Sequence, residues 1–133
     1  MTRITGLEHL TMLDVAPPGF VSAAADAGLD AVGLRVAPVT RGEERWPVSP
    51  GSPLLTETMR RCGGTGVTVL DVEAIAFSPA SDPACEPVLE TPAVLGARFL
   101  NVICDDPDTE RFADRRAASV HARTTTRCSR QGR

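Results

Sequence analysis

One pattern recurs three times in this sequence and constrains its fold more than any other feature. Each copy indicates the end of a helix, a glycine, a short turn and then an apolar run typical of a strand. The glycines of the three copies are separated by 38 and 30 residues, which suits βα units joined by right-handed crossovers. An α/β fold around a parallel sheet is therefore expected. The copies span residues 27–34, 65–72 and 95–102.

Four strands and four helices are expected to alternate along the chain. Short apolar or β-branched runs predict the strands, at residues 7–14, 31–36, 67–73 and 98–104. Apolar residues at helical spacing predict the helices, at residues 18–27, 54–62, 85–95 and from 110 onward. Pro92 lies inside the third helix and is expected to kink or shorten it. Asp108 or Thr109 is expected to cap the fourth.

The length of 133 residues limits how such units can be arranged. A complete (β/α)8 barrel needs about 250 residues and eight strands, so four βα units would make a partial TIM barrel. A doubly wound sheet, by contrast, can be built from four strands. Both architectures are compatible with the periodicity of the sequence.

Four motifs in a fixed order resemble the xylose isomerase-like barrels of the sugar phosphate isomerase/epimerase family. The likeness covers residues 7 to about 112, so residues 1–112 are expected to form the N-terminal half of such a TIM barrel. The motifs are Leu-Glu-His-Leu-Thr at 7–11, Ala-Gly-Leu-Asp-Ala-Val-Gly-Leu-Arg at 27–35, Gly-Val-Thr-Val-Leu-Asp-Val-Glu at 66–73 and Leu-Gly-Ala-Arg-Phe-Leu-Asn-Val at 95–102.

The resemblance implies a chemistry that this chain does not carry in full. Members of the family interconvert sugars or sugar phosphates through an enediolate stabilised by a divalent metal such as Mn, Mg or Zn. Their metal ligands come from strands in the second half of the barrel, and no position of this chain matches those motifs. The chain is therefore expected to hold no metal or other cofactor and to be inactive as an isomerase or epimerase alone. The related apurinic endonucleases fit poorly, because only His9 and His121 are present.

Candidate site residues follow from the rule that barrel active sites lie at the carboxyl ends of strands. Glu73 is the candidate catalytic residue, and His9, Arg35 and Asp105 are candidate substrate-binding residues. Each also has a structural interpretation. His9 would be a hydrogen-bonded structural histidine, Arg35 and Glu73 a rim ion pair, and Asp105 part of a helix-start turn. Asp71 shares a strand face with Glu73, but paired carboxylates are common without an acid–base role.

Charge is distributed unevenly. Residues 1–109 hold 15 acidic and 7 basic side chains, whereas residues 110–133 hold 2 and 7. The acidic body disfavours nucleic acid as the main partner. Residues 113–133 lack an apolar helix face and are expected to be a disordered Arg-rich tail, of the composition that a shifted reading frame in a GC-rich gene would give.

Cellular setting and partners follow from weaker signals. The four cysteines are far apart, without metal-ligand spacing, and no membrane-spanning run occurs, so a cytoplasmic location is expected. No phosphate-loop, dinucleotide or serine-hydrolase motif occurs. If the barrel is completed, the partner is a small sugar or sugar phosphate. The alternative function is a non-catalytic assembly or binding module, in which half-barrels associate and cover their open sheet edges.

Overall fold

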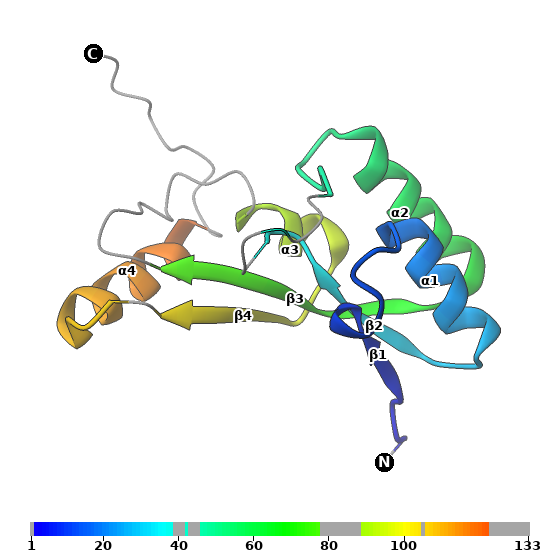
Figure 1. Cartoon of the computed structure of the whole chain (residues 1–133), viewed down its shortest axis with the longest axis horizontal. Coiled ribbons are helices and arrows are strands. Elements are labelled where there is room, and N and C mark those ends of the chain that lie inside the picture. Colours follow the sequence, from blue (N-terminus) through cyan, green and yellow to red (C-terminus); the bar gives the residue numbers. More distant parts are fainter. Residues whose placement is uncertain (1, 39–41, 43–45, 78–88, 105, 123–133) are drawn as a thin grey trace.

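The computed structural model of the chain describes residues 2–38, 42, 46–77, 89–104 and 106–122 (Figure 1). Its centre is a four-stranded sheet in which every neighbouring pair of strands is parallel. The expected α/β class and the four parallel strands are therefore confirmed. The elements in chain order are β1 (Gly6–Glu8), the 3-10 helix η1 (His9–Met12), α1 (Pro17–Asp26), β2 (Ala31–Arg35), α2 (Pro53–Thr65), β3 (Thr68–Phe77), α3 (Thr91–Leu95), β4 (Phe99–Cys104) and α4 (Thr109–Ala122).

The strands lie side by side in the order in which they occur in the chain, β1-β2-β3-β4. A doubly wound sheet reverses its direction of winding, and the described strands show no such reversal. That alternative is therefore wrong for the described part of the chain. The sheet is open, with β1 and β4 as its two outer strands.

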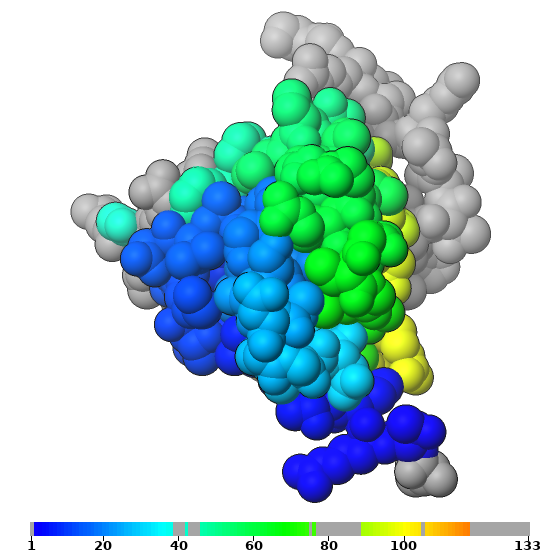
Figure 2. Space-filling model, turned by 90° about the vertical axis from the view of Figure 1, so that its right-hand side faces the viewer, coloured from blue at the N-terminus to red at the C-terminus, as the bar shows by residue number. Residues whose placement is uncertain are grey.

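The core lies between the sheet and the first two helices. In α1, Phe20, Val21 and Ala24 fall on one face and are completely buried, and they pack with Val32 and Leu34 of β2. Period-2 alternation in a strand sends these two β2 side chains to the same face. α1 and α2 lie side by side over this face of the sheet, and their side chains meet on the surface shown in Figure 2.

The ends of α1 and α2 are set by local sequence. Ser52 caps α2, since its hydroxyl accepts a hydrogen bond from the amide of Leu55 at 3.2 Å. Gly28 and Gly66 follow the helices with φ of 71° and 80°, a conformation that favours glycine. The helical prediction for 54–62 was too short, because α2 continues through Gly63 and its neighbour before ending at Thr65.

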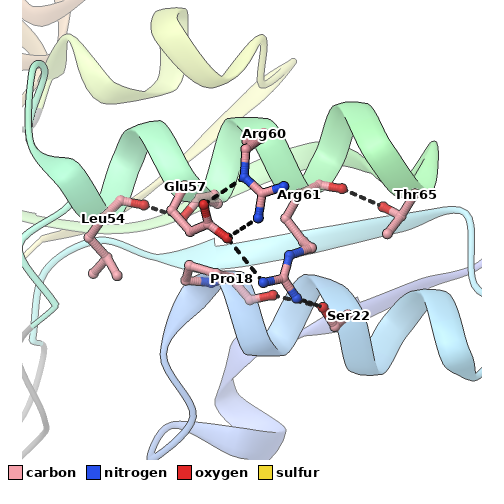
Figure 3. Close-up of polar contacts among 8 residues, drawn as sticks. Pro18, Ser22, Leu54, Glu57, Arg60, Arg61 and Thr65 are labelled. Atoms are coloured by element: carbon pink, nitrogen blue, oxygen red, sulfur yellow. Dashed lines mark hydrogen bonds and ion pairs between the residues drawn. The ribbon is translucent and has the colours of Figure 1, made fainter.

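Polar contacts tie the outer faces of α1 and α2 together (Figure 3). Arg61 of α2 donates hydrogen bonds to the hydroxyl of Ser22 in α1 and to the carboxylate of Glu57, the latter at 3.0 Å. Arg60 also pairs with Glu57, at 2.7 Å from its Nε. The two arginines hold the pKa of Glu57 down, to about 2, chiefly through the hydrogen bond from Arg60.

The first and third strands differ from their predicted lengths. β1 ends at Glu8, and η1 begins at His9, so the strand predicted at 7–14 is wrong beyond Glu8. The buried ring of His9 bonds to the backbone of a neighbouring strand, which requires the chain to turn there. β3 instead extends four residues past Glu73, to Phe77.

The last two helices also correct the sequence prediction. α3 spans only Thr91–Leu95, and Pro92 lies in its first turn, where its missing N–H costs no hydrogen bond, so it does not kink the helix. The predicted residues 85–88 lie outside the described part. α4 continues to Ala122, so the disorder predicted from residue 113 is wrong for residues 113–122, while residues 123–133 lie outside the described part.

Candidate functional site

Three carboxylates from two strands meet on the face of the sheet opposite α1 and α2. Each of Glu8, Asp71 and Glu73 offers one oxygen, and these atoms all lie within 4.8 Å of one another. We call these three residues the acidic cluster. Glu8 is the last residue of β1, and the other two lie in β3, with β2 between the strands.

Gly33 makes this convergence possible. It pairs in register with Glu8 on one side and with Asp71 on the other, so the three residues form one row across the sheet. A Cβ atom at Gly33 would collide with the carboxylates of both neighbours. The missing side chain therefore leaves the space in which the two carboxylates approach each other.

A bulge in β3 directs its two carboxylates to the same face as Glu8. Val32 pairs with Val69, but the next residue of β2 pairs with Asp71, so Leu70 is an extra residue in β3. Because strand side chains alternate with a period of two, one inserted residue changes the face of everything that follows. Val69 and Val72, three residues apart, consequently both pack in the core.

Arg35 and Glu73 form a buried ion pair two register positions beyond Gly33 and Asp71, on the same face of the sheet. They are register partners, their charged groups are 3.3 Å apart, and their side chains are only 7% and 15% exposed. One interpretation of the sequence was that Arg35 and Glu73 form an exposed ion pair at the rim of the sheet. In the structure this pair is shielded from water, so removing one charge would leave the other buried.

The acidic cluster changes the protonation of its members. A hydrogen bond with Glu73 raises the pKa of Glu8 from its ordinary value of 4.5 to about 7, and burial and the charges of Asp71 and Glu73 act in the same direction. Burial, followed by the charge of Glu73, also raises the pKa of Asp71. The pKa of Glu8 therefore lies close to neutral pH.

His9 is fully buried and both of its ring nitrogens are engaged. Nδ1 accepts a hydrogen bond from the amide of Arg35 at 3.2 Å, so Nε2 carries the proton and donates to the carbonyl of Val15 at 2.8 Å. The ring stacks on Phe20 with centroids 4.5 Å apart. Burial lowers the pKa of His9 and keeps it neutral. This geometry gives His9 a structural role, joining β1 to β2 and α1.

Asp105 lies outside the described residues, but its neighbours have defined roles. Asp108 caps α4, as the sequence allowed, because its carboxylate accepts a hydrogen bond from the amide of Arg111 at 3.0 Å. Asp106 accepts another from the Arg111 side chain at 2.7 Å, and this bond lowers the pKa of Asp106. These two aspartates therefore form a helix-start turn.

The donor set of the acidic cluster suits a hard divalent cation. Carboxylate oxygens are preferred by Mg²⁺ and Mn²⁺, whereas zinc sites draw on imidazole and thiolate. One oxygen of Asp71, Oδ1, is buried and has no hydrogen-bond partner among the described residues. Glu8 was not among the site residues predicted from the sequence, because a first strand that continued to residue 14 would place Glu8 near its start and not at its carboxyl end.

Comparisons with known proteins leave the family open. A scan against known protein families gives no match to this chain, and a search among curated proteins gives none either. The described residues contain no helix that is both long enough and apolar enough to cross a membrane.

Proposed function

We propose that the chain is the first half of a xylose isomerase-like barrel of the sugar phosphate isomerase/epimerase type, and that the acidic cluster is half of its sugar site. The observation that carries this proposal is the convergence of Glu8, Asp71, Glu73 and Arg35 on the sheet face opposite α1 and α2. Glu8 and Arg35 are also the last residues of their strands, the location of active sites in barrels. The sequential strand order and the family motifs support the same proposal.

The proposed chemistry is proton transfer between neighbouring carbons of a sugar. Glu73 is our candidate base, because its ion pair with Arg35 fixes the position of its carboxylate. Glu8, whose pKa is raised to about 7, would in its protonated form donate a hydrogen bond to a substrate oxygen. A divalent cation bound by the cluster would supply polarisation of the sugar carbonyl. Arg35 acts in this proposal by holding Glu73, and Asp105 stays a predicted substrate contact.

The chain alone is expected to bind a cation weakly and to turn over no sugar. Three carboxylates leave an Mg²⁺ or Mn²⁺ ion short of the six or so ligands it takes, and the described part of the chain supplies no strands beyond these four to surround the substrate. We would titrate the full chain with Mn²⁺ by calorimetry and assay it with a panel of aldose and ketose phosphates. Weak binding that is lost in Glu73→Gln, but kept in the surface control Glu57→Gln, is the expected result.

Two results would overturn this proposal. Micromolar Mn²⁺ affinity with turnover that Glu73→Ala abolishes would mean that a complete site lies in this chain. The absence of Mn²⁺ binding at pH 8, where Glu8 is deprotonated, would mean that the cluster is no part of a metal site.

A second candidate function is that of an assembly module, formed by association of half-barrels. The observation in its favour is exposed apolar surface on β4, where Phe99 is 54% and Ile103 40% exposed. A cytoplasmic location belongs to both proposals, because neither of the described cysteines, Cys62 and Cys104, is in a disulfide.

A further inference from the structure

Both outer strands of the sheet carry exposed apolar side chains beside their unpaired edges. On β4 these are Phe99, the register partner of Asp71, and Ile103, four residues further along the same strand face. Beside β1 it is Ile4, two residues before the strand and 53% exposed. Neither outer edge is covered by another strand in the part of the chain that the structure describes. Such edges are templates for pairing with a further strand.

The polarity of the sheet makes a second copy a suitable occupant for both edges. All four strands are parallel, so β4 of one copy can pair in the same sense with β1 of another. The two copies are then related by a two-fold axis that coincides with the axis of the ring, so β4 of the second copy pairs with β1 of the first in the same way. The result is a closed ring of eight parallel strands. A barrel of eight strands has an interior that its own side chains can fill completely.

The register of the existing strands predicts which residues meet at the two seams. Within one copy, the line of partners runs from Glu8, the last residue of β1, to Phe99, the first residue of β4. An eight-stranded barrel accumulates a stagger of about eight residues, and so about four for each half. If this row of register partners is continued across the seam, the stagger moves the contact point four residues toward the N-terminus of the second copy's β1. Phe99 then lies opposite Ile4 of the second copy instead of opposite its Glu8. The exposed apolar groups of the two edges then cover each other.

We propose that two copies of this chain associate through β4 and β1 into a closed eight-stranded ring, with Phe99 beside Ile4 of the second copy. This inference rests on the second proposed function, assembly, and names its partner and its contact.

The expected association is weak and reversible. Three half-exposed apolar side chains supply about 250 Å² per copy, whereas a standard interface takes about 800 Å² from each partner. The remainder would come from the strand edges and the inward-facing side chains. Two acidic clusters would also share one interior, and their charges repel, which limits the affinity.

Cysteine cross-linking of the full chain tests the predicted seam. In a background where all four native cysteines are alanine, Ile4→Cys and Phe99→Cys are made separately and mixed under mild oxidation. Opposed Cα atoms in paired strands lie about 5 Å apart, within disulfide range. We expect a disulfide-linked pair of chains. A mixture of Met59→Cys, exposed on α2, with Phe99→Cys is the matched control and should form at least tenfold less.

The double variant carrying both cysteines tests closure of the ring. Two seams should give a species of two chains at any concentration, and a ladder of longer products would overturn the closed ring, because it indicates open filaments. No cross-link between the two single variants, with both folded by circular dichroism, would overturn the pairing itself. Cross-linking depends on neither cation nor sugar, so its failure is distinguishable from failure of the isomerase-type proposal.

Discussion

Replacing Glu8 by glutamine is predicted to stabilise the protein above neutral pH. The folded state binds the Glu8 proton more tightly than the unfolded state, since folding raises the pKa of Glu8 from 4.5 to about 7. The stability that this proton supports is present below pH 4.5 and is lost as the pH rises through about 7. Glutamine keeps a hydrogen-bond donor toward Glu73 at every pH, and so removes this loss.

The magnitude follows from the size of the pKa change. A rise to about 7 would correspond to about 3 kcal/mol for a carboxyl shielded from water. Glu8 is an exposed residue, so solvent screening reduces the expected gain of the variant to about 1 kcal/mol at pH 8.5. At pH 5, where Glu8 is protonated in the folded state, the variant and the natural chain should have nearly equal free energies of unfolding.

Urea unfolding followed by circular dichroism at pH 5 and pH 8.5 measures this difference. Comparing the two chains at each pH cancels the effects of other groups, such as His9, whose lowered pKa destabilises the fold in acid. Glu57→Gln is the matched control, because Glu57 has a lowered pKa and should show no change of effect between these two pH values. If Glu8→Gln has the same effect at pH 5 and pH 8.5, the proposed proton between Glu8 and Glu73 does not exist.

Three further perturbations test other parts of the structure. Gly33→Ala should push Glu8 and Asp71 apart, lower the free energy of unfolding by about 1–3 kcal/mol and lower the pKa of Glu8 measured by NMR. Gly64→Ala, its control, lies inside α2 with open space around it and should raise the free energy of unfolding by about 0.5–1 kcal/mol. His9→Leu should cost about 2–4 kcal/mol in urea unfolding, because the buried amide of Arg35 and the partly buried carbonyl of Val15 lose their partners. A loss below 0.5 kcal/mol would contradict this role. Removing residues 123–133 should leave the melting temperature unchanged within 2 °C, since that segment holds almost no apolar residues, and a larger fall in calorimetry would show that it packs.

Local signals in the sequence were sufficient for the units of this fold. Gly28, Gly66 and Gly96 each end a helix with positive φ, so the repeat of glycine, turn and strand predicted where the units begin and end. The β-branched runs predicted three of the strands to within a few residues of their bounds. These predictions are reliable because backbone conformation at a turn, and apolar periodicity, depend on residues that are close in the chain.

Prediction from the sequence was poorer where a contact with a residue distant in the chain overrides the local pattern. Apolar residues continue past Glu8, yet the chain turns there, because the His9 ring bonds to the amide of Arg35, 26 residues away. α4 extends to Ala122 although its sequence shows little apolar face, and Phe112 packs against Leu89 across a long stretch of chain. Helix propensity and capping at Asp108 are enough to continue the helix once its first turn is held.

The sequence by itself determined the α/β class, the parallel strands and the charge of the individual residues. Only the tertiary structure decided the strand order and the candidate site. Glu8 and Asp71 are 63 positions apart, and they meet because a strand with glycine at position 33 separates them and a bulge at Leu70 sets the face of β3. Strand pairing and register are long-range properties, and a shift of one residue would send both β3 carboxylates into the core.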